Sequence, residues 1–459
     1  MAQPATESSA KEAKPQDQRT FASQARTEDV TGEKPPNGYW TTMMHFAKGY
    51  VGTGIFAMGE GYKNSGLIGG TVLLFLIGFI NVNCQRILIR TAEKINQEEG
   101  KEVKPSFAET VQYTLNNSKL ACLKNNAKTL GWFTNFSVVG CELGFCCVYY
   151  VFIADHLLEI ASNHNLLNHK QPESIHIVLL IMLIPMWAST FLRNLKLLLP
   201  LSIIANILIW SGVIIVFYYT TYEGLPPASD RYLLSPLERW PLYFGTVLYA
   251  FEGITFILPL RNEMKRPEQF INWYGVLNVG MVFVMILYFF VGMLSYWKYG
   301  EDVESSVFLN LTQEDKNMSD VINVIVSIAI LFTFTLHMYI PFEVTFPLIY
   351  RKYGPFKHGI VVAALYRSSL VLTTWTLANV VPFLGLFISL IGATGGSFLT
   401  LIMPPILEMI AFQGELGIVI IVKDILILIL GVVGSAFGTV MAIIAIVNKF
   451  RVEYFGEEL

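Results

Sequence analysis

The chain has 459 residues, of which 53% are hydrophobic and only 15% are charged. Soluble domains carry about 25% charged residues, so a soluble helical protein would lack the polar surface needed to cover this much apolar area. The formal net charge of −3 excludes binding to nucleic acid through a general basic field. The composition therefore indicates a membrane protein.

The first 40 residues contain little that would pack into a core. They are rich in Ala, Pro, Gln, Ser, Glu and Lys, which is typical of disordered segments, and we expect residues 1–40 to form a disordered cytoplasmic tail. Such a tail offers a contact for a cytoplasmic signalling partner. The charged stretch is too long for the n-region of a signal peptide, so the first apolar run is expected to act as its own insertion signal.

Eleven apolar runs follow the tail, and each is long enough to be a membrane-spanning helix. A hydrocarbon core of about 30 Å takes roughly 20 helical residues to cross, and lipid offers no partner to an open sheet edge, so helices are expected rather than strands. The predicted spans are residues 42–61, 66–90, 131–158, 175–192, 197–220, 242–261, 273–297, 320–341, 359–380, 383–405 and 421–447. They form one transmembrane domain over residues 41–449, followed by a short C-terminal tail over residues 450–459.

Lysine and arginine concentrate in the loops that face the cytoplasm if the N-terminus is inside the cell, and this fixes the expected orientation. The residues Lys449 and Arg451 oppose it, because eleven spans place them outside. Two glycosylation sequons, at Asn310 and Asn317, then lie in one outer loop, and we expect N-glycosylation there.

Two spans contain glycine-rich interruptions at corresponding positions. The first span holds Gly52, Thr53 and Gly54, and the sixth holds Glu252 and Gly253. Glycine is unfavourable inside a helix and allows the backbone to unwind. One interruption alone would be better explained by close packing between helices. Two matched interruptions instead indicate a transporter built of two inverted repeats, with its substrate held at the middle of the membrane.

The repeats would extend over about residues 42–220 and 242–405, with residues 421–447 as an additional helix. At such breaks the N-termini of the half-helices face a substrate carboxylate, and the freed carbonyl groups face its ammonium group.

Four sequence blocks resemble the proton-assisted amino acid transporters of the amino acid/auxin permease superfamily. They are MMHFAKGYVGTGIFAMGEGYKNSGLIGG in the first span, GFCCVYYVFIADHL in the third, FEGITFILPLRNEMKRPE in the sixth and FISLIGATGGSFLTLIMPPILE in the tenth. The resemblance extends from about Thr41 to Lys449. It implies a LeuT-type fold of eleven helices in a 5+5 inverted repeat, broken in helices 1 and 6. It also implies sodium-independent symport of protons with alanine, glycine or proline.

The chain departs from this family at three points. In the first span, Tyr50 and Val51 replace the Asn and Ile of the stretch that relatives often read as Gly-Asn-Ile-Gly-Thr-Gly. In the third span, Glu142 stands where relatives often carry glutamine. The outer loops lack the cysteines that commonly pair in the family. The first two changes lie near the expected site and therefore bear on substrate size and coupling.

The candidate site residues follow from the breaks and from the charges at membrane depth. The residues expected to bind substrate are Gly52, Thr53, Gly54, Phe251, Gly253, Ile254 and Tyr149.

The candidates for proton coupling are His45, Glu252 and Glu142. Ionisable groups inside a membrane are costly, so their presence there indicates a functional role. His45 lies two helical turns before Gly52, which places both on one face, and imidazole titrates near neutral pH. The family resemblance also places a coupling histidine at this position. A neutral histidine hydrogen-bonded between helices is the alternative. Glu252 suits either a proton site or a cap for the broken segment. His337 could line the pathway, but a lone histidine in a span is more often a packing residue.

The sequence thus predicts a secondary active transporter that couples small neutral amino acids to protons. An amino-acid-sensing receptor that signals through the tail, and a sodium-coupled symporter, are the alternatives. Phosphate-binding loops, HExxH pairs and nucleophile elbows do not occur in the chain, so an enzyme is not expected. We expect no metal site and no cofactor beyond the proton as coupling ion, and a multi-pass location in the plasma membrane or in the late endosome or lysosome.

Overall fold

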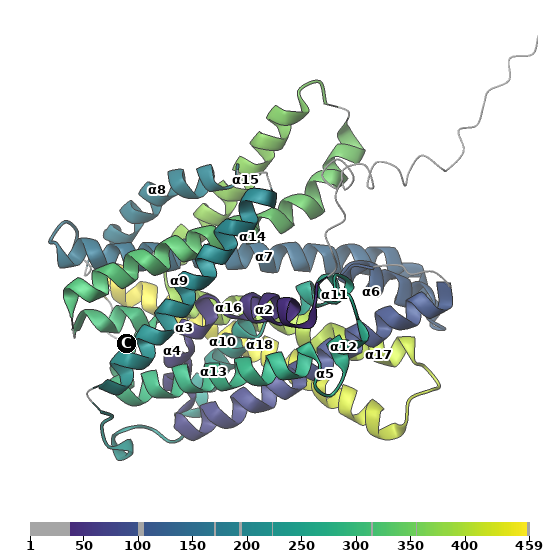
Figure 1. Ribbon diagram of the computed structural model, residues 1–459, viewed down its shortest axis with the longest axis horizontal. Coiled ribbons are helices and arrows are strands. Elements are labelled where there is room, and N and C mark those ends of the chain that lie inside the picture. The colour runs from purple at the N-terminus through teal and green to yellow at the C-terminus, as the bar shows by residue number, and fades with distance from the viewer. Residues whose placement is uncertain are drawn as a thin grey trace, which may run out of the picture.

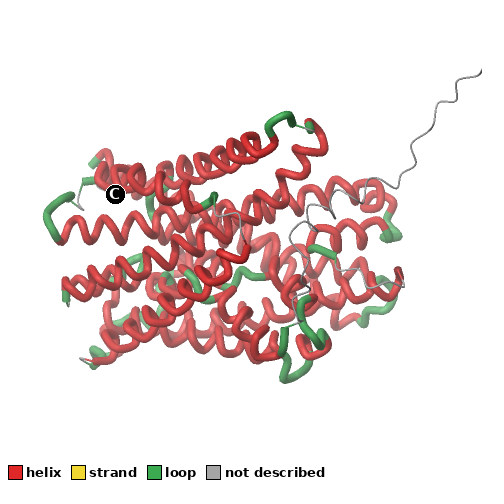
Figure 2. The backbone as a smooth tube through the Cα atoms, turned by 45° about the horizontal axis from the view of Figure 1, so that its top comes forward, coloured by secondary structure: helices red, strands yellow, loops and turns green. Residues whose placement is uncertain are grey.

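The computed structural model describes residues 37–99, 105–168, 171–191, 195–222, 224–313, 315–354 and 356–456. Nearly all of this part of the chain is helical, and its long helices run alongside one another with short connections (Figure 1, Figure 2). The all-α class is therefore confirmed. Most of the expected cytoplasmic tail, residues 1–36, lies outside the described residues.

The first half of the described chain forms eight helices. They are α2 (Tyr39–Tyr50), α3 (Thr53–Phe56), α4 (Met58–Ser65), α5 (Leu67–Glu99), α6 (Phe107–Asn116), α7 (Ala121–Asn163), α8 (Pro172–Ser189) and α9 (Leu195–Tyr222).

The second half begins with two short 3-10 turns, η2 (Ala228–Asp230) and η3 (Leu237–Arg239). The helices α10 (Trp240–Ala250), α11 (Ile254–Asn262), α12 (Glu268–Ile271) and α13 (Val276–Tyr299) follow, and then the turns η4 (Gly300–Asp302) and η5 (Val307–Gln313). The last elements are α14 (Lys316–Tyr353), α15 (Gly359–Val380), α16 (Leu384–Ile391), two π-helical stretches η6 (Gly392–Gly396) and η7 (Phe398–Ile402), α17 (Met403–Ala411) and α18 (Ile418–Phe455).

Ten of the eleven predicted membrane spans are confirmed. Within the described ranges, 10 segments are long and apolar enough to cross a membrane, and they correspond to the second through the eleventh predicted runs. The first predicted run is divided among α2, α3 and α4, each of which is too short to span a bilayer alone. These three pieces, taken together, complete the expected set of eleven.

Several helices continue well beyond the apolar runs that predicted them. The helix α7 has 43 residues, which at 1.5 Å per residue gives a length of roughly 65 Å, about twice the hydrocarbon thickness. The helix α14 has 38 residues and is capped by Asp315, whose carboxylate accepts hydrogen bonds from the backbone N–H groups of Asn317 and Met318. The helix α18 ends at Phe455, inside the stretch expected to be a C-terminal tail.

The broken first and sixth spans lie at the centre of the bundle. In Figure 1, α2, α10 and α16 lie between α7 and α14 on one side and α5 and α13 on the other. The helix α13 packs against α2 and α4, while α10 packs against α16, η6 and α18. The packing of α10 on the tenth span is backbone to backbone, because a Cβ atom on Gly392 would lie 1.9 Å from the carbonyl oxygen of Gly245.

The outer surface of the bundle is apolar over a large area. Phe79, Ile184, Ile207 and Phe437 are all more than half exposed. Monomeric soluble proteins rarely expose contiguous apolar patches of more than a few hundred Å², so this surface fits contact with lipid chains.

Candidate functional site

The first and sixth spans break where the sequence predicts. The helix α2 ends at Tyr50 and α3 begins at Thr53, with a non-helical Gly52 between them (φ −143°, ψ −149°). The helix α10 ends at Ala250 and α11 begins at Ile254, with Gly253 as its N-cap residue. This confirms the expected broken helices 1 and 6.

The two breaks touch each other. A Cβ atom on Gly54 would lie 2.8 Å from the Cα atom of Ala250, and a Cβ atom on Gly253 would lie 2.7 Å from the ring of Tyr50. Across the same contact, the hydroxyl groups of Thr53 and Tyr249 are 2.8 Å apart and hydrogen-bonded. The absent side chains of two glycines therefore allow the unwound segments to cross at one point.

The half-helices that leave the breaks begin without a side-chain cap. Neither Gly52, before α3, nor Gly253, before α11, contributes a capping side-chain hydrogen bond. The first N–H groups of a helix have no partner inside the helix, and the dipole places partial positive charge at that end. Both starts therefore offer N–H donors to a negative group.

The carbonyl groups at the ends of α2 and α10 are already occupied. The hydroxyl oxygen of Tyr288 lies 2.5 Å from the carbonyl oxygen of Tyr50 and 2.8 Å from that of Ala250. The side-chain amide of Asn81 donates to the carbonyl oxygen of Phe251 at 2.7 Å. We expected freed carbonyls to face a substrate ammonium group, whereas these three face donors of the protein: Asn81 donates to Phe251, and the one hydroxyl hydrogen of Tyr288 serves either of the other two.

A buried carboxyl group lies inside the second break. Glu252 is 7% exposed, and its Oε2 atom accepts a hydrogen bond of 2.9 Å from the hydroxyl of Thr400 in η7. Its Oε1 atom is buried and has no hydrogen-bond partner among the described residues. One carboxyl oxygen is therefore available at the point where the two spans cross.

A second carboxyl group belongs to an ion pair between α7 and α14. The Oε2 atom of Glu142 lies 2.8 Å from Nδ1 of His337, and the side chains are 5% and 29% exposed, respectively. The imidazole ring contacts the rings of Phe145 and Tyr149, with centroid distances of 5.5 and 5.2 Å. His337 is therefore more than a packing residue, since it pairs with a carboxyl group of another span.

The remaining predicted binding residues divide between the two breaks and α7. Thr53 and Ile254 begin the half-helices and are buried, and Phe251 packs its ring against Tyr288 at a centroid distance of 5.2 Å. Tyr149 lies on α7 beside His337 rather than at a break. The structure thus brings these residues into one neighbourhood, with Tyr149 at its edge.

His45 is half-buried in α2. The expectation that it shares a helical face with Gly52 does not hold, because α2 ends at Tyr50 and the helical register stops before Gly52.

The two predicted glycosylation sites differ in access. Asn310 is fully buried; its Nδ2 donates to the carbonyl oxygen of Asp302 at 2.8 Å, and its Oδ1 accepts from the backbone N–H of Glu304 at 3.0 Å. Asn317 is exposed in the first turn of α14. A glycan requires an outward-facing amide, so the fold favours Asn317.

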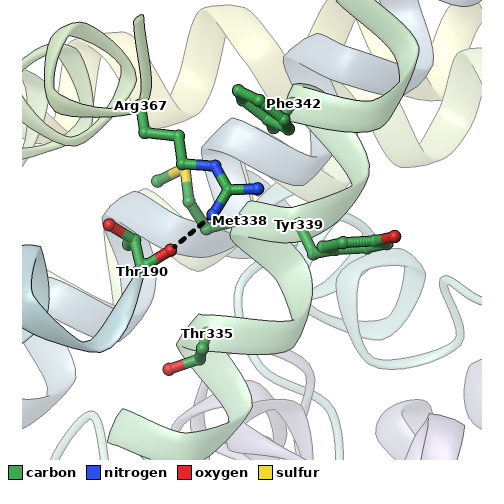
Figure 3. Close-up of a pocket in the computed structure, with 6 residues that line it drawn as sticks. All are labelled: Thr190, Thr335, Met338, Tyr339, Phe342 and Arg367. Carbon is green, nitrogen blue, oxygen red and sulfur yellow. Dashed lines mark hydrogen bonds between the residues drawn. The ribbon is translucent and has the colours of Figure 1, made fainter. Parts of the chain in front are cut away.

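A small cavity lies beside the stretch of α14 that carries His337, lined by Thr190, Thr335, Met338, Tyr339, Phe342 and Arg367 (Figure 3). The guanidinium of Arg367 donates to the carbonyl oxygen of Thr190 at 3.0 Å and lies 4.0 Å from the centre of the Phe342 ring. The cavity measures about 10 Å³, room for about one water molecule, so it is too small to be an amino-acid site.

Sequence reasoning missed the residues that support the breaks. Asn81 and Gln85 are four residues apart, and the side-chain amide of Gln85 donates to both Tyr50 Oη at 2.6 Å and Asn81 Oδ1 at 2.7 Å. Two buried amides on one face of an apolar span are unusual, and this spacing was a usable signal. Tyr288 offered none, because it is one of 21 tyrosines in a chain rich in aromatic residues.

Comparison with known proteins agrees with this geometry. Residues 36–444 match the family described as transmembrane amino acid transporter proteins. The proton-coupled amino acid transporter-like protein pathetic of Drosophila melanogaster is 31% identical over 412 residues, which cover 89% of this chain and 85% of that protein. The probable amino acid transporter skat-1 of Caenorhabditis elegans is 24% identical over 378 residues, 81% of this chain and 80% of that one.

Among solved structures, the inward-facing conformation of Mhp1 matches with a TM-score of 0.53 at 14% identity, over 92% of this chain and 93% of that one. This likeness extends over nearly the whole of both chains and confirms the LeuT-type fold. The protein is a multi-pass integral membrane protein rather than an enzyme, and it belongs to the family of transmembrane amino acid transporters.

Proposed function

We propose that this protein is a secondary active transporter that carries small neutral amino acids, of the alanine, glycine and proline class, together with protons. One observation carries the proposal: the uncapped starts of two half-helices lie where the two broken spans cross, next to the buried carboxyl group of Glu252. An amino acid is a zwitterion, with one carboxylate and one ammonium group. The crossing point offers a complementary group for each.

The substrate carboxylate would accept hydrogen bonds from the N–H groups that follow Gly52 and Gly253. The ammonium group would donate to Oε1 of Glu252, which has no other partner among the described residues. The carbonyl oxygens of Tyr50, Ala250 and Phe251 are poorer acceptors for it, because Asn81 donates to Phe251 and the Tyr288 hydroxyl lies between the other two and donates to one of them. This assignment makes Glu252 a substrate-binding residue rather than a cap for the break.

The room around this point supports a small substrate. Gly54 already lies against the backbone of Ala250, and the rings of Tyr50 and Phe256 crowd Gly253. The buried carboxyl groups of Glu142 and Glu252 would repel an acidic side chain. A short, uncharged side chain therefore fits best.

Two observations support the coupling to protons. The Drosophila relative is itself named as proton-coupled amino acid transporter-like. In addition, Glu142 and Glu252 are carboxyl groups buried within the membrane-spanning bundle. A charge at that depth is costly unless it is paired or neutralised by a proton, so such groups respond to the proton gradient.

The test is uptake of labelled alanine by purified protein in sealed vesicles, with proton and sodium gradients imposed separately. We expect an inward proton gradient to drive accumulation and a sodium gradient at equal pH to drive none. Accumulation driven by sodium alone would contradict proton coupling. Binding of alanine without any flux would indicate a receptor, and the same assay on protein lacking residues 1–39 would then test the role of the tail.

A single substitution tests the role of Glu252. Glu252→Gln removes the charge but keeps the shape of the side chain, and the KM for alanine should rise about tenfold or more, because hydrogen bonds to charged groups contribute about 1.5–3 kcal/mol. Glu301→Gln is the matched control, since Glu301 pairs with Arg239 at the exposed outer surface. An unchanged KM in Glu252→Gln would remove this residue from the binding site.

A further inference from the structure

We propose that Thr400, in the tenth span, is a positioning residue for substrate binding: it holds one carboxyl oxygen of Glu252 so that the other faces the ammonium group of the amino acid. This inference rests on the proposed function above and deepens it. In this assignment Glu252 contacts the substrate, and Thr400 acts only through Glu252. The tenth span thus takes part in binding without contacting the amino acid itself.

The two carboxyl oxygens of Glu252 have different surroundings. Its Oε2 atom accepts a hydrogen bond of 2.9 Å from the hydroxyl of Thr400, whereas its Oε1 atom is buried and has no hydrogen-bond partner among the described residues. Both residues are buried. A buried carboxyl oxygen without a partner is costly, so Oε1 requires a donor. The hydrogen bond at Oε2 fixes how the carboxyl group is turned and therefore where Oε1 lies.

The hydroxyl of Thr400 departs from the usual direction in a helix. A threonine hydroxyl in a helix commonly donates to the carbonyl group three or four residues earlier. Thr246 of α10 donates in this way to Leu242, and Thr394 of η6 donates to Leu390. Thr400 instead donates to a carboxyl group 148 positions earlier in the sequence. Its hydroxyl therefore serves a contact between spans rather than its own helix.

A series of close contacts sets the register between the tenth span and α10. Three contacts precede the one at Glu252, and in each of them a residue of the tenth span meets the backbone of α10. They are Ser389 on Leu242, Gly392 on Gly245 and Gly396 on Leu248. The steps are three or four residues along both spans, and the contact of Thr400 with Glu252 continues the series in the same direction. The register of the two spans therefore fixes the position of the Thr400 hydroxyl.

Glu252 needs this support because it lies in the non-helical segment between α10 and α11, outside the backbone hydrogen bonding of either helix. Asn81 of α5 holds the carbonyl group of Phe251, and Thr400 holds the carboxyl group of the next residue. Two neighbouring residues of the break are thus fixed from two different spans. The stretch that carries Thr400 is π-helical, and π turns are rare and occur frequently at functional sites.

The experiment measures the KM and the maximum rate of alanine uptake in sealed vesicles under one fixed inward proton gradient. Thr400→Val removes the hydroxyl but keeps the size and branching of the side chain, whereas Thr400→Ser keeps the hydroxyl. Glu252→Gln and the double variant Glu252→Gln with Thr400→Val complete the set. Thr394→Val is the matched control, because it removes a hydroxyl of the same π-helical region whose acceptors are carbonyl groups of its own span.

We expect Thr400→Val to raise the KM about five- to tenfold and to leave the maximum rate within about twofold of wild type, because the carboxyl group remains but loses its fixed direction. Thr400→Ser should restore the KM to within about twofold of wild type. The double variant should match Glu252→Gln within about twofold, since two residues that act through one contact do not add. Thr394→Val should match wild type.

Three results would overturn this inference and leave the proposed function in place. The first is an unchanged KM in Thr400→Val when Glu252→Gln raises it. The second is a double variant whose KM rises by the product of the two single effects, which would make Thr400 independent of Glu252. The third is a KM in Thr400→Ser as high as in Thr400→Val, which would assign the effect to packing. An unchanged KM in Glu252→Gln, or no alanine uptake by the wild-type protein, would refute the proposed function and this inference with it.

Discussion

Gly54→Ala is the sharpest test of the contact between the two breaks. The added Cβ atom would lie 2.8 Å from Cα and 2.9 Å from Cβ of Ala250. Carbon atoms in contact are about 3.5–4.0 Å apart, so α3 must move away from Ala250 by about 0.7 Å. The same movement would lengthen the hydrogen bond between Thr53 and Tyr249 from 2.8 Å to about 3.5 Å, where it is effectively lost.

The expected energetic effect has three parts. Overpacking costs about 1–3 kcal/mol, and the lost hydrogen bond costs about 1 kcal/mol. The better helix propensity of alanine offsets up to about 1 kcal/mol. The net cost of about 1–3 kcal/mol falls on the arrangement in which the breaks meet, so kcat/KM for alanine uptake should fall by about fivefold to more than a hundredfold.

Gly140→Ala is the control for this substitution. Gly140 lies in α7, outside both breaks, and a Cβ atom added there would meet no atom within 4 Å. We expect its uptake kinetics and thermal stability to stay close to wild type. Equal damage from the two substitutions, or normal uptake in Gly54→Ala, would refute the packing argument and leave glycine serving only the unwinding of the backbone.

Three further predictions concern the support of the site and the outer loop. Tyr288→Phe should lower the free energy of unfolding by about 1–3 kcal/mol and reduce alanine exchange, because it leaves a buried carbonyl at the breaks without a donor. Tyr243→Phe is the control: it loses a hydrogen bond to the carbonyl of Gly70, away from the breaks, and should leave exchange intact. Lys423→Met should lower the free energy of unfolding by about 3 kcal/mol, since it removes the cation beside the buried Glu408 and Asp424. Lys449→Met should lower it by less than about 1 kcal/mol, because the ion pair of Lys449 with Glu453 is exposed. In a eukaryotic host, Asn317→Gln should abolish the glycosidase-sensitive gel shift and Asn310→Gln should not; the reverse result would contradict the packing of the outer loop.

Sequence reasoning was reliable for features that are local along the chain. Apolar runs gave the spans, since each helix satisfies its own backbone hydrogen bonds and needs only enough apolar length. The two breaks were also local features, because glycine weakens a helix wherever it occurs. Helix ends were less predictable, as α7 and α14 show: a helix continues into water wherever polar residues with good helix propensity follow the apolar stretch.

Pairings between distant spans were not predictable from one sequence. Glu142 and His337 are 195 positions apart, and Glu252 and Thr400 are 148 apart. Nothing in the sequence near either residue indicates its partner, because the partner depends on which helical faces meet. The π-helical stretch that carries Thr400 was missed for a related reason: π turns are rare and depend on the packing around them.

The hydrogen bonds at the breaks also indicate how the two spans separate. A hydroxyl group carries one hydrogen, so Tyr288 donates to the carbonyl of Tyr50 or to that of Ala250 at any moment, although both oxygens lie within 2.8 Å. If α2 moves away from α10, Tyr288 keeps a partner on α10, and only the carbonyl of Tyr50 must be hydrated. The donor is never left unsatisfied, so the hydroxyl adds little to the barrier for this movement. The N-terminal starts of α3 and α11 have no such internal partner, and a bound carboxylate would hold them together. A bound substrate would thus add a second interaction across the breaks to the hydrogen bond that Thr53 and Tyr249 already make there.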